Sequence, residues 1–320
     1  MRAGVIGHPI THSLSPALHG RWLDRFGLDG TYEAVDPGPD GFAACVARLR
    51  AEGWAGCNVT LPFKAEALAL ADRADGTARR AGAANTLVFA EDGITASNTD
   101  VVGFASALGE ALRRRTDVPC PPARGGTAIS DREGGGTVVA AAGTGLTTAH
   151  PPRTAAPGPV PPQAGGQSPG SALVLGAGGT APAVLSALLS MNIQELRLAN
   201  RTLEAAEALA DRFGATVVPW DDRHDAADAD ILVNATALGL PGKPPLDIDL
   251  SALPPRAVVA DCVYVRGGVT PLVAAARQRG LTAIDGLPML VRQAVPGFAA
   301  WYGRTPDDLT EVETFLRGLS

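Results

Sequence analysis

The sequence predicts an α/β protein of two domains, and three observations support this class. From residue 3 to about 115, short apolar runs alternate with stretches of helical periodicity, and a second alternation starts at residue 172. Residues 116–170 between them are rich in proline, glycine, alanine and threonine. A chain of 320 residues is long enough for two domains that each bury their own core. We therefore expect domains at 1–115 and 171–285.

In the first alternation, the expected strands are short apolar runs bounded by glycine, proline or asparagine. They cover 3–6, 32–35, 56–59, 86–89 and 94–96. Helical periodicity is present at 42–52, 65–71 and 77–81 and after Asp100. A further helix is expected from Pro16, because proline is tolerated in the first turn of a helix.

In the second alternation, strands are expected from 172 and at 196–199, 215–218, 231–233, 258–261 and 283–284. A helix from about Pro182 follows the first of them. Strands that alternate with helices in this way form a doubly wound parallel sheet. We expect helices in 286–320 to return to the first domain and complete it.

Residues 116–170 cannot bury enough apolar surface to offset the entropy lost on ordering. We interpret this segment as a low-complexity insertion that acts as a disordered linker. A small additional subdomain is the alternative.

Charge and cysteine usage exclude several classes of protein. A net charge of −6 and an isoelectric point near 5.4, without a basic stripe, argue against nucleic acid or an anionic membrane as partner. The four cysteines lack CxxC spacing, so no metal site is indicated, and we assign turn and surface roles to His8, His12 and His19. The N-terminus does not resemble a signal peptide and no apolar run reaches ~18 residues, so we expect a cytoplasmic protein.

A glycine-rich turn lies directly between the strand from 172 and the next helix. Gly176 permits a tight turn, Gly178 lets the backbone approach a pyrophosphate, and Ala181 allows the helix to pack closely. The candidate cofactor-binding segment is Gly176, Ala177, Gly178, Gly179, Thr180 and Ala181. The pattern predicts a Rossmann dinucleotide-binding domain, and the alternative is a glycine turn without a ligand.

Two further strand ends contribute to this prediction. The strand at 196–199 ends at Asn200, Arg201 and Thr202, where NAD-binding proteins usually carry an acidic residue. An arginine there pairs with a 2′-phosphate, so we predict NADP, unless Arg201 is a solvated surface residue. Asn234 and Thr236 end another strand toward the nicotinamide, although either is also a residue type that caps helices.

Lysine is rare in this chain, because only Lys64 and Lys243 of the 27 basic residues are lysine. Lysine, unlike arginine, can lose a proton at an accessible pH, so Lys64 indicates acid–base chemistry. It ends a polar segment, 58–64 (NVTLPFK). Other polar segments at strand ends or helix starts are 13–16 (SLSP), 85–86 (NT) and 98–100 (NTD).

Together these segments resemble the shikimate dehydrogenase family. The matching motifs of the first half are 5–10 (VIGHPI), 13–16 (SLSP), 58–64 (NVTLPFK), 82–87 (GAANTL) and 98–100 (NTD). Those of the second half are the glycine turn, 200–202 (NRT), 234–236 (NAT), 261–264 (DCVY) and 285–293 (DGLPMLVRQ). The resemblance covers the whole chain except about 116–170.

The resemblance implies reversible NADP-dependent reduction of 3-dehydroshikimate to shikimate, in aromatic amino acid biosynthesis. Lys64 and Asp100 would be the catalytic pair, and Gly286 would line the nicotinamide. The implied substrate contacts are Ser13, Ser15 and Tyr264 at the carboxylate, and Asn58, Thr60, Asn85 and Gln293 at ring hydroxyls. A lysine beside a carboxylate must lose its proton before it can act in the oxidative direction, so we expect oxidation to accelerate toward alkaline pH. Domain 1–115, with 286–320, would bind the small-molecule substrate, in a monomer or homodimer.

Three positions depart from the family pattern, and several alternatives stay open. Val101 and Pro288 replace glycines, and Ala205 replaces a second basic residue near the ribose, so use of NAD is also compatible with the sequence. Ser13 and Ser15 are also suited to capping the helix from Pro16. A quinate or aminoshikimate dehydrogenase, or a non-catalytic sensor of the same metabolite, would share most of these motifs.

Overall fold

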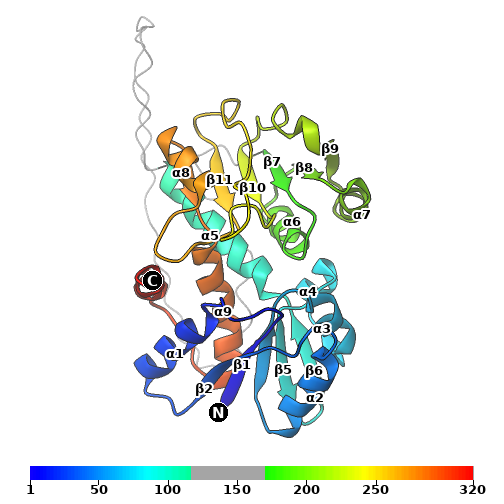
Figure 1. Cartoon of the computed structure of the whole chain (residues 1–320), viewed down its shortest axis with the longest axis vertical. Helices are drawn as coiled ribbons and strands as arrows, with labels where there is room; N and C mark the ends of the chain where they lie inside the picture. Colours follow the sequence, from blue (N-terminus) through cyan, green and yellow to red (C-terminus); the bar gives the residue numbers. More distant parts are fainter. Residues whose placement is uncertain (117–169, 320) are drawn as a thin grey trace, which may run out of the picture.

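The computed structural model describes residues 1–116 and 170–319, and these residues form two six-stranded sheets (Figure 1). The insertion predicted for 116–170 lies outside the described residues, apart from its two end positions. Two sheets flanked by helices confirm the predicted α/β class.

The first sheet is mixed, and its one reversed strand brings polar residues together. Its strands are β1 (Arg2–Ile6), β2 (Thr31–Val35), β3 (Gly56–Val59), β4 (Arg73–Ala74), β5 (Thr86–Ala90) and β6 (Gly93–Ser97), in the order β2-β1-β3-β5-β6-β4. Strand β5 runs antiparallel to β3 and β6, whereas the other pairs are parallel. The beginning of β5 therefore lies at the same edge as the ends of β3 and β6. Asn58 pairs with Thr86 in this register, and Thr86 pairs with Ser97.

Four helices accompany the first sheet. They are α1 (Ser15–Phe26), α2 (Phe42–Ala51), α3 (Lys64–Leu70) and α4 (Gly76–Ala81). The prediction of turn and surface roles for histidines is wrong for His19, which is fully buried in α1. His19 stacks on Tyr32 with ring centroids 3.8 Å apart, and Trp22 and Phe298 lie beside it. The position thus belongs to an aromatic core.

The second sheet is fully parallel. Its strands are β7 (Ser171–Leu175), β8 (Glu195–Asn200), β9 (Thr216–Pro219), β10 (Ile231–Asn234), β11 (Val258–Asp261) and β12 (Thr282–Ile284), in the order β12-β11-β10-β7-β8-β9. Helices α6 (Ala181–Ser190), α7 (Leu203–Phe213) and α8 (Pro271–Gln278) and a 3₁₀ turn (Trp220–Arg223) connect the strands. The strand order reverses between β7 and β10, which is where doubly wound sheets bind ligands.

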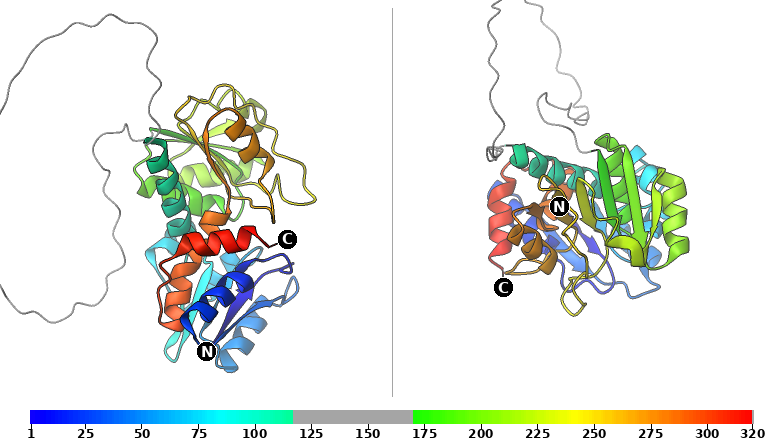
Figure 2. Two further views of the ribbon diagram at one scale, coloured as in Figure 1. Left: turned by 90° about the vertical axis from the view of Figure 1, so that its left-hand side faces the viewer. Right: turned by 90° about the horizontal axis from the view of Figure 1, so that it is seen from above.

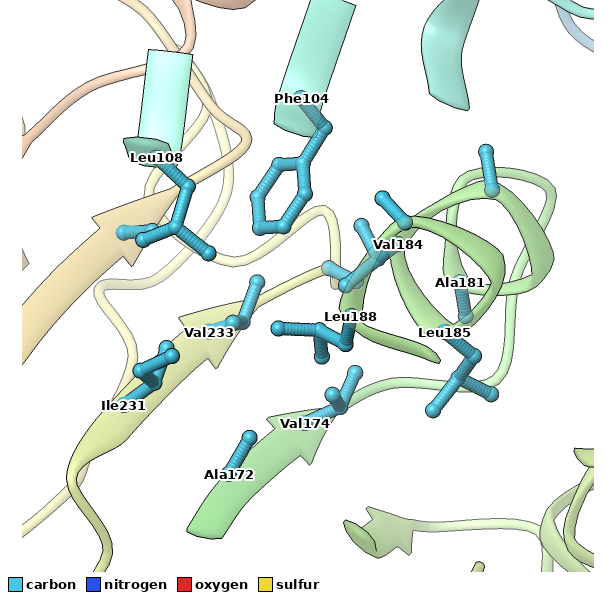
Figure 3. Packing of buried hydrophobic residues seen from close by; sticks show 14 of the residues in the cluster. Phe104, Leu108, Ala172, Val174, Ala181, Val184, Leu185, Leu188, Ile231 and Val233 are labelled. Carbon is cyan, nitrogen blue, oxygen red and sulfur yellow. The ribbon is translucent and has the colours of Figure 1, made fainter. Parts of the chain in front are cut away.

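Three helices join the two halves: α5 (Thr99–Thr116), α9 (Leu287–Tyr302) and α10 (Leu309–Arg317). Phe104 and Leu108 of α5 pack on α6 and on the strands β7 and β10 of the second sheet (Figure 3). Helices α9 and α10 return to the first half (Figure 2). Phe298 of α9 joins the aromatic core around α1. Helix α9 crosses α5 so closely that a Cβ on Gly103 would lie 2.7 Å from the Cβ of Gln293.

The chain leaves the first half and enters the second at one small polar cluster, which we call the Arg256–Asp230 clasp. Arg115, near the end of α5, donates Nη1 to the carbonyl oxygen of Arg256 at 2.9 Å. Gly170, just before β7, donates its N–H to Asp230 Oδ2 at 2.8 Å. Asp230 and Arg256 form an ion pair at 2.8 Å. Arg115, just before the predicted insertion, and Gly170, its last residue, are therefore bonded to the same pair.

Candidate active site

Lys64 and Asp100 form a buried ion pair at the edge where the polar segments meet. Lys64 is the first residue of α3 and Asp100 lies in the first turn of α5. Lys64 Nζ and Asp100 Oδ2 are 2.5 Å apart, and the two side chains are only 11% and 10% exposed. An ion pair with so little access to water interacts more strongly than one at the surface. The two groups predicted to be catalytic are thus in direct contact.

Asn85 connects this pair to α9. Its Nδ2 donates to Asp100 Oδ1 at 2.9 Å and to Gln293 Oε1 at 3.1 Å, although Gln293 is 208 residues away in the sequence. Its Oδ1 accepts the backbone N–H of Thr99 at 2.7 Å. Asn85, Asp100 and Gln293 are all buried. The structure therefore brings together Lys64, Asp100, Asn85 and Gln293.

The backbone positions these side chains through the sheet. Asn85 lies just before β5, where its N–H donates to the carbonyl oxygen of Ser97 and its own carbonyl oxygen accepts from Val59. Ala84 donates to the carbonyl oxygen of Lys64 at 2.8 Å, which fixes the start of α3. Because β5 is antiparallel, Asn85 lies between the ends of β3 and β6.

Ser13 and Ser15 lie at the start of α1, but neither side chain caps it. The N-cap residue is Leu14, which has no side-chain cap, and Ser13 Oγ accepts the N–H of Ser15 at 3.2 Å. Tyr264, from the loop after β11, reaches this turn. Burial raises the pKa of Tyr264, and a hydrogen bond with the Leu14 backbone partly opposes the increase. The structure thus places Tyr264 beside the serine turn.

Asn58 and Thr60, which flank the end of β3, differ in their accessibility. Thr60 is half-buried, and its N–H donates to the carbonyl oxygen of Ile6 at 2.9 Å. Asn58 is 5% exposed, and its amide is bonded within the protein on both sides. Thr60 therefore keeps its side chain accessible, whereas Asn58 belongs to the interior.

The glycine turn after β7 has the backbone geometry that a pyrophosphate requires. Gly176 has a φ of 103°, and a Cβ there would lie 2.8 Å from Cγ2 of Thr236. A Cβ on Gly178 would meet no atom within 4 Å, so the space above it is open. No side chain caps α6, whose first residue is Ala181. Helix N-termini of this kind bind anions through backbone N–H groups.

Side chains at the ends of β8 and β10 shape this turn. Asn200 Oδ1 accepts the N–H of Ala177 at 3.1 Å. Asn234 Oδ1 accepts from the N–H and hydroxyl of Thr236 at 3.0 and 2.7 Å, while its Nδ2 donates to Asp261 Oδ1 at 2.9 Å. No helix starts at Asn234 or Thr236, so the capping alternative does not apply to either. These contacts orient the loops around the glycine turn.

The position beside the adenosine ribose is basic and exposed. Strand β8 ends at Asn200 without a carboxylate, and Arg201 and Thr202 are both exposed. An exposed guanidinium at this point fits the 2′-phosphate of NADP, and it leaves no acidic group to accept from the 2′-hydroxyl of NAD.

Two of the three departures from the family pattern fit the local structure. Val101 is 5% exposed and belongs to the apolar cluster between α5, α6 and the second sheet. Pro288 lies in the first turn of α9, where a backbone N–H has no partner within the helix. A residue near this departure, Gly286, caps α9, and a Cβ there would lie 2.3 Å from the carbonyl oxygen of Cys262. Ala205 lies in the first turn of α7 and supplies no charge.

The glycine turn and the ion pair face each other across the two halves. A Cβ on Gly179 would lie 2.9 Å from Cδ2 of Leu61, an exposed residue of the loop before Lys64. Burial raises the pKa of the Cys262 thiol. The negative charge of Asp100 raises this pKa further and the positive charge of Lys64 lowers it, so the thiol lies near the ion pair. Leu61 and Cys262 were not predicted as site residues, because an apolar loop residue and a lone cysteine carry no sequence signal.

Comparisons with known proteins agree with this geometry. Residues 5–87 match the family model of the shikimate dehydrogenase substrate binding domain, and residues 164–241 match that of shikimate / quinate 5-dehydrogenase. The chain is 45% identical over 305 residues to a shikimate dehydrogenase (NADP(+)) of Acidiphilium cryptum. The aligned residues cover 95% of this chain and 91% of that protein.

Two solved structures have the same fold. One is a shikimate 5-dehydrogenase of Thermus thermophilus in complex with NADP(H) and shikimate, with a TM-score of 0.73, 32% identity, and coverage of 99% of this chain and 98% of that chain. The other is a quinate dehydrogenase of Corynebacterium glutamicum in complex with NAD, with a TM-score of 0.75, 27% identity, and coverage of 98% and 97%.

Proposed function

The chain belongs to the shikimate dehydrogenase family, and we propose that it catalyses the reversible NADP-dependent reduction of 3-dehydroshikimate to shikimate. The observation that carries this proposal is the buried contact of 2.5 Å between Lys64 Nζ and Asp100 Oδ2, which faces the glycine turn. A proton donor beside a dinucleotide site is what the reduction of a ketone to an alcohol requires.

Lys64 and Asp100 move the proton in this proposal. When the ketone is reduced, Lys64 as an ammonium donates a proton to the carbonyl oxygen as that oxygen gains electron density. In the reverse direction, neutral Lys64 takes the proton from the hydroxyl, and Asp100 stabilises the ammonium that forms. Asn85, which donates to the other oxygen of Asp100, keeps the carboxylate oriented toward Lys64.

The substrate is held at its two ends by different groups. We propose that Ser13, Ser15 and Tyr264 bind the carboxylate, because they form a turn of neutral hydrogen-bonding groups. Asn85 and Gln293, which share a hydrogen bond beside Asp100, together with Thr60, are suited to the ring hydroxyls.

The cofactor supplies the hydride when it is bound, and the chain provides its position. The turn from Gly176 to Ala181 offers backbone N–H groups to the pyrophosphate, and Arg201 pairs with the 2′-phosphate. Asn200 and Thr236 shape the loops beside this turn. The family resemblance assigns Gly286 to the nicotinamide end.

Initial rates measured by nicotinamide absorbance test the proposal. Purified protein is offered shikimate and quinate in parallel, each with NADP and with NAD. We expect turnover to be fastest with shikimate and NADP, and to increase toward alkaline pH. Preference for quinate or for NAD would contradict the assignment within the family.

Quinate oxidation is the second candidate, because the quinate dehydrogenase of Corynebacterium glutamicum covers 98% of the chain with a TM-score of 0.75. An aminoshikimate dehydrogenase and a non-catalytic sensor are further alternatives; cofactor binding without turnover would identify the sensor. We also propose that the protein works in the cytoplasm as a monomer or homodimer, which light scattering distinguishes. Among the helices of the described part of the chain, none has the length and apolar character that a bilayer crossing requires.

A further inference from the structure

A chain of buried hydrogen bonds runs from Tyr32 on β2 to Asp100, and we call it the Tyr32 chain. The Tyr32 hydroxyl donates to Asn58 Oδ1 at 2.6 Å. Asn58 Nδ2 donates to the carbonyl oxygen of Asn85 at 3.1 Å and to Thr86 Oγ1 at 3.0 Å. Asn85 Nδ2 then donates to Asp100 Oδ1 at 2.9 Å. All five residues are buried, so water does not compete for these bonds.

The Tyr32 chain leaves Asn58 with no amide hydrogen for a ligand. Nδ2 carries two hydrogens, and both are donated inside the protein. The carbonyl oxygen of Asn85 is an acceptor only, so Nδ2 must face β5 and Oδ1 must face Tyr32. The tyrosine hydroxyl therefore acts as the donor that satisfies Oδ1. Without this hydroxyl, Oδ1 would be a buried acceptor with one fewer partner, and Asn58 would be freer to turn.

Tyr32 is itself held firmly, and it also reaches the opposite end of the site. Its ring stacks on His19 with an interplanar angle of 3° and a centroid distance of 3.8 Å. Burial raises the pKa of Tyr32, and a hydrogen bond with the Ser15 side chain opposes the increase. The phenol thus lies between Ser15, which we propose to bind the carboxylate, and Asn58, which leads to Asp100.

We propose that Tyr32 is a positioning residue for the proton-transfer pair, acting through Asn58 and Asn85 on the orientation of Asp100. Asn58 then belongs to the framework of the site rather than to the groups that touch the ring. This inference rests on the proposed function, because it assigns a catalytic task to Lys64 and Asp100.

The substitution Tyr32→Phe tests the proposal, because it removes the hydroxyl and keeps the stacked ring. The control is Tyr302→Phe. Tyr302 lies in the same aromatic cluster, is equally buried, and donates its hydroxyl at 2.7 Å to the carbonyl oxygen of Thr31, next to Tyr32. We expect Tyr32→Phe to lower kcat about 10-fold with KM for NADP unchanged, and Tyr302→Phe to leave kcat unchanged. Equal kcat in the two variants would overturn the proposal.

A double-mutant cycle separates this role from a general loosening of the fold. If Tyr32 acts through Asn58, then Tyr32→Phe should cost nothing further in an Asn58→Ala background. Additive losses would contradict the proposal. If Tyr32→Phe does not fold, Thr86→Val, which breaks the chain at its next link, should give the same loss of kcat, and an unchanged kcat there would count against the chain.

A spectroscopic measurement tests the chain without turnover. The side-chain amide resonances of Asn58 and Asn85 should shift in Tyr32→Phe and stay in place in Tyr302→Phe. Unmoved resonances in Tyr32→Phe would overturn the inference. A wild-type protein that does not oxidise shikimate would count against the proposed function alone, because the amide shifts do not depend on it.

Discussion

The two sides of the proposed site are built in different ways. Around Asp100, side chains from separate elements do the positioning, because Lys64 and Asn85 both donate to Asp100 and Asn85 also donates to Gln293. At the glycine turn, the proposed cofactor site is formed by backbone, and the absence of side chains leaves room for a ligand. Gly176 has a backbone conformation that other residues rarely adopt, and Gly178 leaves its surroundings open.

This difference follows from what each side must do. Moving a proton requires specific groups at hydrogen-bond distance, so a single displaced amide matters. Binding a pyrophosphate requires several N–H groups and close approach, which a short loop at a helix N-terminus supplies. Substitutions on the substrate side should therefore change kcat, and substitutions at the glycine turn should change cofactor binding or folding.

The largest expected effect is on the substrate side. Lys64→Ala removes the proposed proton donor, and kcat should fall about 1,000-fold, because general acid–base catalysis contributes ~10²–10⁴-fold. Lys243→Ala is the matched control, since Lys243 is the other lysine of the chain and is exposed. Initial rates with shikimate and NADP measure both. A loss below about 10-fold in Lys64→Ala would remove the lysine from the mechanism.

The next effect compares two glycines of one turn. Gly176→Ala places a Cβ 2.8 Å from Cγ2 of Thr236 at a φ of 103°, and it should cost about 3 kcal/mol of unfolding free energy. Gly178→Ala has free space and should leave stability unchanged while KM for NADP increases. Chemical denaturation and initial rates measure the two. The comparison fails if Gly178→Ala lowers kcat instead.

A third prediction concerns stability in acid. Burial lowers the pKa of His19 from 6.5 to about 3. Since the unfolded chain binds the proton more tightly, stability contributed by neutral His19 is present above pH ~6.5 and is lost as pH falls toward ~3. Between pH 7 and about pH 5 the free energy of unfolding should decrease by about 2 kcal/mol. The substitution His19→Phe should abolish this decrease.

The control for His19 is His12→Phe, because His12 is exposed. Urea unfolding at both pH values measures the difference. Burial raises the pKa of Asp261 in the second half, so protonation of that group favours the folded state and acts in the opposite direction. An unchanged acid response in His19→Phe would mean that the aromatic core does not exclude the imidazolium.

The smallest effect is expected at the ribose. Arg201→Ser should lower kcat/KM for NADP about 10-fold and leave that for NAD nearly unchanged, because one charge-assisted pair is lost. Arg304→Ser, at an exposed arginine beyond α9, is the control. Equal losses with both cofactors would show that Arg201 does not contact the 2′-phosphate.

The sequence predicted best what depends on local pattern. The strands 56–59 and 258–261 were predicted with the bounds that the structure has, because both are buried runs, of which the first begins at Gly56 and the second ends at Asp261. Strand β4, with two residues, is too short for any alternation to appear. Arg201 and the glycine turn could also be predicted from the sequence, because each directly follows an apolar strand.

Long-range contacts were beyond the reach of residue patterns. The hydrogen bond of Gln293 to Asn85 depends on how α9 crosses α5, and only the family resemblance suggested Gln293. Tyr32 looked like an apolar strand residue, since nothing in the sequence indicates that its hydroxyl meets Asn58. The burial of His19 likewise depends on aromatic neighbours from α9 that are far away in the sequence.

The Arg256–Asp230 clasp has a consequence for how such a chain can diverge. Arg115 and Gly170 are bonded to the same ion pair. The chain therefore leaves the first half and enters the second half at one place, beside the amino ends of β7 and β11. The glycine turn lies at the opposite, carboxyl end of β7, where Gly179 faces Leu61 of the loop before Lys64. A change in chain length between Arg115 and Gly170 should therefore leave the contact between Lys64 and Asp100 in place.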